Sequence, residues 1–272
     1  MNAKTQIKSS LPAVILGAIL IAIWQTSCVV FSIPQFLLPT PLSIAQEIAA
    51  NHRDLLLNTW ITCQEAALGF LIANILALAL AVCMVYIKNL DKAVMPIAIA
   101  MKTTPIVAMA PLLLLWFGTG MLPKIMAAAL ICFFPVLVNS IKGFNALLEN
   151  EEDLFRIYSA SKTQLLLKLR FFRAAPFIFS ALRISSSLAI VGAIIGEFVG
   201  ANHGIGYVIL VSSYHLETVR MFAALVMAAL AGVVFYGIVS FFDAKIITWS
   251  QSPSDEIRLE SPPKTLAERG PR

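Results

Sequence analysis

Six long apolar stretches dominate this sequence and limit the folds that it can adopt. They cover residues 11–31, 59–87, 94–117, 122–141, 176–200 and 221–249. A helix needs about 20 apolar residues to cross the hydrocarbon core of a bilayer, where every backbone polar group must be paired within the protein. Hydrophobic residues make up 59% of the chain and charged residues 13%, far from the composition of soluble domains. The sequence therefore predicts an all-α membrane protein with about six transmembrane helices.

The first apolar stretch follows a short basic head with Lys4 and Lys8, a pattern that cleavable signal sequences also show. The stretch runs on to Phe31, however, and no small-residue cleavage motif closes it. We therefore interpret residues 1–10 as a cytoplasmic N-terminus and residues 11–31 as the first spanning helix.

Lysine and arginine are unevenly divided between the two sides of the predicted helices. With the N-terminus inside, fifteen of these cations fall in inward segments and three, Arg53, Lys124 and Arg220, in outward segments. Cytoplasmic loops retain Lys and Arg, so the imbalance predicts that both termini lie in the cytoplasm. Residues 11–249 then form one transmembrane domain, and the polar, proline-bearing residues 250–272 are predicted to be a disordered cytoplasmic tail.

Prolines interrupt two of the predicted spans. Pro105 and Pro111 fall in the stretch 94–117, while Pro123 and Pro135 fall in the next stretch, 122–141. Each proline removes a backbone donor and is expected to kink or break its helix. Interrupted helices occur along transport pathways, although proline is also commoner in membrane helices in general.

Small residues recur at four-residue spacing in the fifth span, at Gly192, Gly196 and Gly200. Glycines in this register let two helix backbones approach closely, which favours association where lipid supplies no hydrophobic drive. The pattern predicts a helix-packing seam, either within one subunit or between two.

A cytoplasmic segment, LFRIYSASKTQLLLKLRFF at residues 154–172, interrupts the apolar character of the chain. Leu154, Ile157 and Tyr158 mark one apolar face at helical spacing. Three small residues, Ser159-Ala160-Ser161, then end that pattern.

A second helix start follows directly. Ser161 with Gln164 three residues later fits a capping box, so a second short helix is predicted to run through Leu169 until Pro176 opens the next span. Two short helices joined by a bend would present an apolar knob flanked by cations, a shape that suits a groove on a soluble partner.

This segment resembles the cytoplasmic loop of the membrane permease subunits of bacterial ATP-binding cassette (ABC) importers. The loop of that family carries Glu-Ala-Ala, three residues, Gly, nine residues and Ile-x-Leu-Pro. Here Asp153 takes the Glu position, Ser159 the Gly position and Leu169 the Ile position, while Phe171 and Phe172 stand where Leu-Pro is usual. A serine is expected to avoid the positive φ that glycine tolerates, which predicts a different angle at the bend.

Four further stretches strengthen the resemblance: APLLLLWFG (110–118), FFPVLVNSIKGF (133–144), ALRIS (181–185) and GAIIGEFVGANHGIGYVIL (192–210). They are similar to the branch that serves nitrate, sulfonate, taurine and bicarbonate importers, which also includes pyrimidine-precursor, thiamine-related and riboflavin permeases. The resemblance covers roughly residues 36–249 and implies a type I ABC importer permease fold. It also implies that residues 150–174, which we call the coupling segment, dock on an ATPase. The implied docking residues are Asp153, Leu154, Ile157, Tyr158, Ser159, Ala160, Ser161 and Leu169.

The resemblance further implies a multi-pass protein of the bacterial inner membrane that works with other subunits. These are ABC ATPase subunits, a second permease subunit that is identical or different, and an extracytoplasmic substrate-binding protein. The chain contains no G-x-x-x-x-G-K-[ST] motif, so no cofactor is expected on this subunit, and ATP with Mg is expected on the ATPase. No metal site is expected, since the three histidines lack metal-ligand spacing, and no nucleic-acid partner is expected.

Several ionisable residues lie inside the predicted spans, where an unpaired charge costs about 2.5–3.5 kcal/mol on insertion scales. Lys102 stands just before Thr103-Thr104-Pro105. It would attract an anionic substrate if it faces a cavity, or be structural if it pairs with Glu65 or Glu197. Snorkelling to the cytoplasmic face is a third alternative. The candidate path residues are therefore Lys102, Thr103, Thr104, Pro105, Glu65 and Glu197.

Two other classes of function remain as alternatives. A secondary transporter driven by an ion gradient would use the intramembrane carboxylates and would need no ATPase. An intramembrane enzyme is disfavoured, because the sequence has no H-E-x-x-H, no G-x-S-x-G and no paired aspartates within its spans.

Overall fold

The computed structural model describes residues 3–87, 89–147 and 149–247; the predicted tail at 250–272 lies outside this range. The described residues form helices and loops without a β-strand. The elements are α1 (Ala3–Val30), α2 (Pro41–Ala50), α3 (His52–Tyr86), α4 (Leu90–Thr103), α5 (Ile106–Phe117), α6 (Leu122–Asn145), α7 (Glu149–Ile157), α8 (Lys162–Leu165), the π-helical turn η1 (Leu166–Arg170), α9 (Phe171–Glu197), α10 (Ile205–Tyr214) and α11 (Thr218–Ile246).

The predicted all-α membrane architecture is confirmed. Four helical runs in the described residues are long and apolar enough to cross a bilayer: α3, α6, the continuous run Lys162–Glu197 that ends with α9, and α11. The number rises to five when α4 and α5 are counted as one bent span, and the apolar part of α1, Val14–Val30, is a shorter helix.

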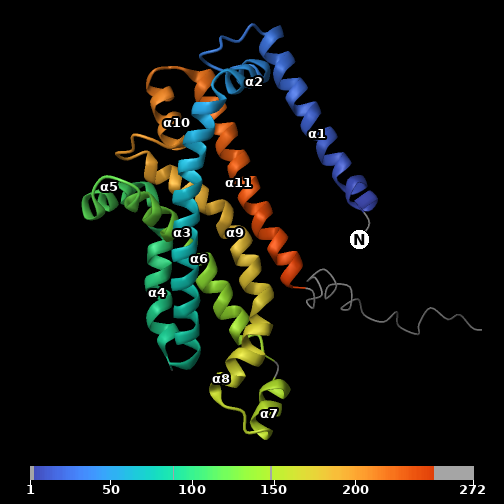
Figure 1. Cartoon of the computed structure of the whole chain (residues 1–272), viewed down its shortest axis with the longest axis vertical. Coiled ribbons are helices and arrows are strands. Elements are labelled where there is room, and N and C mark those ends of the chain that lie inside the picture. Colours follow the sequence, from blue (N-terminus) through green and yellow to red (C-terminus); the bar gives the residue numbers. More distant parts are fainter. Residues whose placement is uncertain (1–2, 88, 148, 248–272) are drawn as a thin grey trace, which may run out of the picture.

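The stretch 94–117 was predicted as one span that Pro105 and Pro111 kink or break; the helix is broken at Pro105, and Pro111 lies inside α5. α4 ends at Thr103, α5 begins at Ile106, and the two helices are bent by 100° relative to each other. Pro105 has no N–H to continue the helix and forces Thr104 into an extended conformation (φ −70°, ψ 124°). α5 consequently leaves the direction of α4 and projects sideways from the bundle (Figure 1).

α3, α6 and α9 form the centre of the bundle, and small residues allow their close approach. A Cβ atom on Gly192 would lie 2.6 Å from Cα of Ala128, and one on Gly196 would lie 2.7 Å from Cα of Lys124. The seam at Gly192 and Gly196 therefore joins α9 to α6 within one subunit. Gly200 lies beyond the end of α9 in a left-handed conformation (φ 71°).

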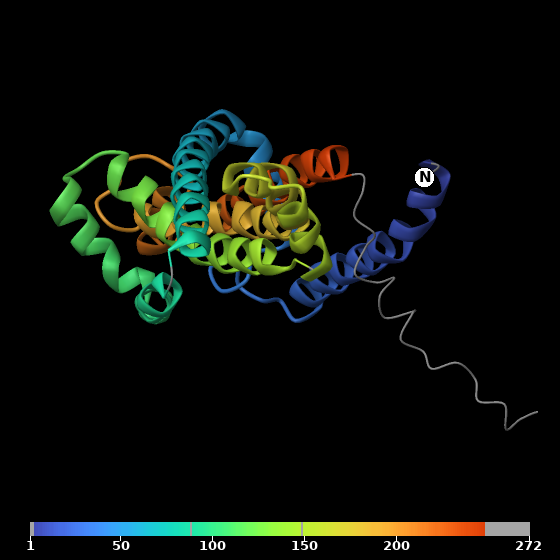
Figure 2. The ribbon, with the colours of Figure 1, turned by 90° about the horizontal axis from the view of Figure 1, so that it is seen from below.

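The remaining elements lie at the two ends of the bundle or beside it. α1 stands apart from the other helices in both views and meets them at the outer end, where Trp24 contacts Phe222 with ring centroids 6.1 Å apart (Figures 1 and 2). α2 lies across the outer end and packs against α11 (Figure 1). α7 and α8 project from the opposite end, which the charge distribution places in the cytoplasm (Figure 1).

Candidate functional site

The coupling segment presents an exposed apolar surface at the end of the bundle from which α7 and α8 project. Ile157 and Tyr158 are each 78% exposed and Leu154 is 52% exposed, all from α7 and the turn after it. Asp153 is also exposed in α7, while Ala160 and Leu169 are half-buried. The apolar knob expected from the sequence is therefore present on the surface of the described residues.

The bend between α7 and α8 corrects the expectation for Ser159. This residue adopts the positive φ (52°) that the sequence suggested a serine would avoid. The N–H of Ala160 donates to the carbonyl of Phe155 (3.0 Å), which is the hydrogen bond of a Schellman motif with Ser159 at its left-handed position. Ser159 thus occupies the left-handed position that glycine most often takes at the end of a helix. The predicted capping box of Ser161 and Gln164 is confirmed, with both of its hydrogen bonds formed.

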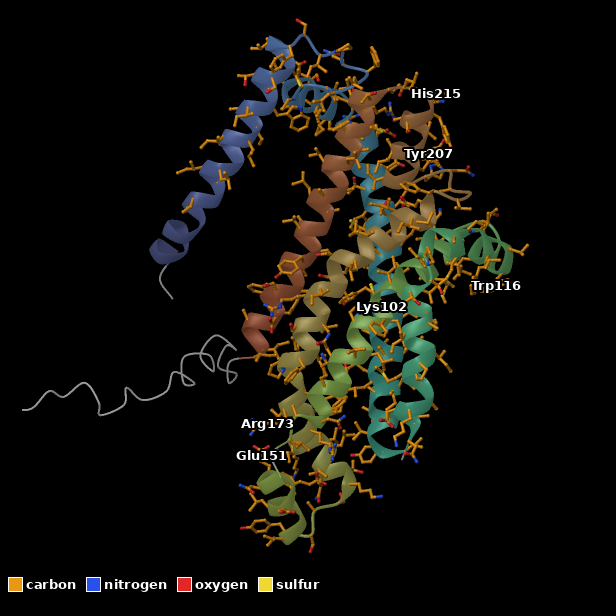
Figure 3. All side chains as sticks on the ribbon, turned by 180° about the vertical axis from the view of Figure 1, so that it is seen from behind. Lys102, Trp116, Glu151, Arg173, Tyr207 and His215 are labelled. Carbon is orange, nitrogen blue, oxygen red and sulfur yellow. The ribbon has the colours of Figure 1, made fainter. Side chains whose placement is uncertain are left out.

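Polar contacts attach the coupling segment to the ends of the spanning helices. The hydroxyl of Tyr86, the last residue of α3, donates to the carbonyl of Lys162 (3.0 Å). Arg170 donates to the carbonyl of Phe144 (3.2 Å), at the end of α6. Arg173 and Glu151 form an ion pair between α9 and α7 (Figure 3). Periodicity within one segment gives no sign of these contacts, because their partners are far apart in the sequence.

A groove of about 330 Å³ lies where α4 bends into α5. Its lining includes Lys102, Thr103, Thr104 and Pro105, together with apolar residues of α6 and α9. The ammonium of Lys102 lies 4.7 Å from the centre of the Phe134 ring, a cation–π contact. Four of the predicted path residues are therefore brought together on one groove.

Glu65 and Glu197, the other two predicted path residues, lie elsewhere. Both are fully buried, and neither lines the Lys102 groove. Glu65 pairs with Lys124 of α6 (3.4 Å) rather than with Lys102. Lys124, expected among the outward cations, is 6% exposed, because the first turn of α6 packs against Glu65 of α3 and Gly196 of α9.

Glu197 is the centre of a group of buried polar residues. Its carboxylate accepts from the hydroxyl of Thr62 (2.5 Å) and from the N–H of Gly206 (2.6 Å). With Asn58, Thr62, Glu65 and Lys124, it forms a set that we call the outer polar cluster, between α3, α6, α9 and α10. The sequence marked Glu65 and Glu197 as buried charges but did not identify Lys124 as their neighbour.

Comparison with known proteins gives consistent results. Residues 64–248, more than half of the chain, match the family described as binding-protein-dependent transport system inner membrane component. A probable ABC transporter permease protein of Haemophilus influenzae is 34% identical over 79% of this chain and 87% of its own length. The riboflavin transport system permease protein of Chloroflexus aurantiacus is 32% identical over 86% of this chain and 88% of its own length.

The chain is more distantly similar to other permeases and to one chain of a solved transporter structure. Permeases named for formylaminopyrimidine, aliphatic sulfonates and nitrate are 25–29% identical to this chain. A chain of the MetNI methionine ABC transporter, solved in inward-facing conformations, superimposes with a TM-score of 0.62 at 15% identity, over 71% of this chain and 96% of that one. The match in structure shows a shared fold. This protein therefore belongs to the binding-protein-dependent inner membrane transport components, as the multi-pass permease subunit of an ABC importer.

Proposed function

We propose that this permease forms the translocation path for a small anion such as nitrate, a sulfonate, taurine or bicarbonate. The observation that supports this substrate class is the position of Lys102 on a groove of about 330 Å³ beside the broken pair α4 and α5. A water molecule takes about 30 Å³ of liquid volume, so the groove has room for a small anion with part of its hydration shell.

The chemistry of the groove favours negative charge. Lys102 is the one ionisable side chain among the described residues that line it, and a lysine ammonium offers three donors to an anion. The hydroxyls of Thr103 and Thr104 both donate to the carbonyl of Ala100, at 3.0 and 2.9 Å, so their hydrogens are engaged and Lys102 is the donor available to an anion. An anion would therefore be recognised through Lys102, with the threonines completing the polar side of the groove.

A flat heterocycle, such as a pyrimidine or thiamine precursor or riboflavin, is the second candidate. Phe134 lines the same groove and offers an aromatic face. Relatives named for riboflavin and formylaminopyrimidine transport give this alternative support from similarity. An anion would then bind the ammonium of Lys102, whereas a heterocycle would stack on the ring of Phe134.

The energy for transport comes, in this proposal, from separate ATPase subunits that bind ATP and Mg and dock on the coupling segment. The exposed knob of Leu154, Ile157 and Tyr158 supports this assignment, because clustered apolar and aromatic residues are typical of the energetic centre of an interface. A second permease subunit, identical or different, and an extracytoplasmic binding protein complete the proposed importer. The path roles of Glu65 and Glu197 stay predictions.

The test is ATP-dependent uptake by the complete importer in proteoliposomes. Labelled nitrate, taurine and bicarbonate are compared with labelled riboflavin, with and without ATP. For an anion, Lys102→Met is expected to raise the half-saturating concentration by about tenfold, the effect of losing one hydrogen bond to a charged group. Lys92→Met on the exposed surface of the same helix is the control and is expected to behave like the wild type.

The outcomes separate the candidates. Uptake of riboflavin that survives Lys102→Met but is lost in Phe134→Ala would favour the heterocycle. Solute accumulation without ATP and without the ATPase subunits would contradict the ATP-driven proposal and favour an ion-coupled secondary transporter.

A further inference from the structure

α10 is a short helix at the outer end of the bundle, and other helices supply the acceptors for its first backbone N–H groups. The N–H groups of Gly204, Ile205 and Gly206 donate, in that order, to Oδ1 of Asn58 (2.9 Å), Oγ1 of Thr62 (2.8 Å) and Oε2 of Glu197 (2.6 Å). The first N–H groups of a helix have no partner within the helix, and Gly204 has no side chain to cap them. α3 and α9 therefore hold the start of α10 in place.

Glu197 connects these contacts to one another. Its two oxygens accept from different elements, Oε1 from the hydroxyl of Thr62 on α3 (2.5 Å) and Oε2 from the N–H of Gly206 on α10. The fit leaves no space: a Cβ atom on Gly206 would lie 2.6 Å from Oε2, and one on Gly204 would overlap the same carboxylate. A buried carboxylate at a helix N-terminus is also favoured by the helix dipole.

The outer polar cluster reaches the extracytoplasmic surface. The side-chain amide of Asn58 donates to Asp54 (3.1 Å), and Asp54 pairs with Arg220 (2.7 Å), in the first turn of α11. The connection between α10 and α11 is exposed beside this pair, with Tyr214 at 78% and Leu216 at 75%. A displacement of that outer surface therefore acts on residues that are bonded, step by step, to Glu197.

The helix that carries Glu197 also reaches the cytoplasm. Glu197 is the last residue of α9, and α9 continues without a break in the helix through η1 and α8 back to Lys162. This run of 36 residues is about 54 Å long at 1.5 Å per residue, enough to cross the membrane. Its outer end thus lies in the outer polar cluster and its inner end in the coupling segment.

We propose that Glu197 is a positioning residue of the transport cycle. It holds α10 on α3 and α9, so that movement of the outer surface is carried along α9 to the coupling segment. The inference rests on the proposed function, because it requires an ATPase at the coupling segment and a binding protein at the outer surface. Without the carboxylate, α10 moves independently of α9 and the two ends of the importer are no longer linked.

The first experiment measures amide hydrogen exchange on the complete chain in detergent and needs no partner. In Glu197→Ala, exchange at the start of α10 is expected to be about 10–100 times faster, because charge-assisted hydrogen bonds are lost there. Exchange in α6 is expected to stay unchanged. Gln64→Ala is the matched control, since Gln64 is exposed on α3 next to buried Glu65.

Glu197→Gln tests whether α10 is held by the hydrogen bonds of residue 197 or by its negative charge. A glutamine can accept the N–H of Gly206 and donate to Thr62, whose hydroxyl still has the carbonyl of Asn58 within 3.2 Å. Exchange in Glu197→Gln is therefore expected to lie within about threefold of the wild type. Faster exchange throughout α3, α6 and α9 in Glu197→Ala would show that the carboxylate is needed for the whole fold and would overturn the positioning role.

The second experiment measures ATP hydrolysis by the complete importer with and without its solute-loaded binding protein. Glu197→Ala is expected to keep basal hydrolysis and to lose stimulation by the binding protein, while Glu197→Gln restores the stimulation. Stimulation that is unchanged in Glu197→Ala would overturn the inference. If the importer containing the wild-type chain hydrolyses no ATP, the proposed function is contradicted. The exchange experiment would then still decide whether Glu197 holds α10.

Discussion

The outer polar cluster and the coupling segment are both rich in charge, yet their charges lie in opposite environments. In the cluster, Glu65 and Glu197 are fully buried and Lys124 is 6% exposed. At the coupling segment, the side chains of the Arg173–Glu151 pair are 45% and 24% exposed. Solvent therefore screens the charges of the coupling segment and hardly reaches those of the outer polar cluster.

The difference predicts how each region responds to change. Breaking a buried ion pair leaves a charge without compensation and is strongly destabilising, whereas an exposed pair contributes about 0–1 kcal/mol. The outer end of the molecule is therefore fixed by contacts between helices. The inner end is held by weaker contacts and by local backbone geometry, which suits a segment that must dock on a partner and move with it.

Removing the ammonium of Lys124 is the most severe test of this comparison. Lys124→Met leaves Glu65 buried with no cation, so we expect a loss of about 3–5 kcal/mol in the free energy of unfolding. Lys124→Met combined with Glu65→Leu removes both charges and is expected to recover most of that loss. The measurement is reversible denaturation of the purified chain in mixed detergent micelles.

The matching change at the inner end is Arg173→Met. Its expected cost is about 0–1 kcal/mol, because the Arg173–Glu151 pair is partly exposed. Equal losses in the Arg173 and Lys124 variants would contradict the distinction between the two regions.

Glycine substitutions test whether close helix packing also fixes the outer region. In Gly192→Ala, the new Cβ would lie 2.6 Å from Cα of Ala128, so the helices must separate. We expect a loss of about 1–3 kcal/mol by the same denaturation assay. Gly232→Ala is the control, because nothing lies within 4 Å of a Cβ at that position and alanine is the better helix former. A neutral Gly192→Ala variant would mean that the seam between α6 and α9 is loose.

The sequence predicted what depends on neighbours along the chain. Apolar runs gave the long helices, and the spacing of Ser161 and Gln164 gave the capping box. The apolar knob was also visible, because helical periodicity places Ile157 and Tyr158 three and four residues after Leu154, on the same face. Each of these features follows from a few consecutive residues.

Contacts between distant residues were not predictable in the same way. Thr62 and Glu197 are 135 positions apart, and nothing in the sequence around either one names the other. Lys124 was counted among the cations of the outward segments. The apolar pattern does not show that the first turn of α6 packs against other helices and buries this side chain. The break at Pro105 was predicted without its angle of 100°, since proline marks a break but the angle depends on packing.

Docking of the ATPase tests the inner region directly. Ile157→Ala removes an exposed apolar side chain from the proposed docking surface, so we expect affinity for the ATPase to fall about tenfold. Stability of the isolated permease is expected to be unchanged, because Ile157 is 78% exposed. Binding of the purified ATPase to the permease in nanodiscs is the measurement. Thr163→Ala, exposed on the next helix, is the control, and equal affinity in both variants would exclude the knob as the docking surface.

Ser159→Gly is the mildest test of the comparison. A left-handed conformation costs a non-glycine residue about 1–2 kcal/mol, and glycine avoids this cost but loses more backbone entropy on folding. We expect a net gain of under about 1 kcal/mol, confined to the bend, and exchange of the Ala160 N–H slowed by about two- to fivefold.

Exchange at the start of α10 should not change in Ser159→Gly, because the substitution changes only the backbone freedom of the bend and moves neither end of the run Lys162–Glu197. The size of the effect at Ala160 also separates two causes of order in the coupling segment. An unchanged rate at Ala160 would mean that the contact from Tyr86 to Lys162 holds the bend and that the dihedral angles of Ser159 follow from it. The inner region would then resemble the outer one, fixed by contacts between helices, and the contrast between them would rest on solvent exposure alone.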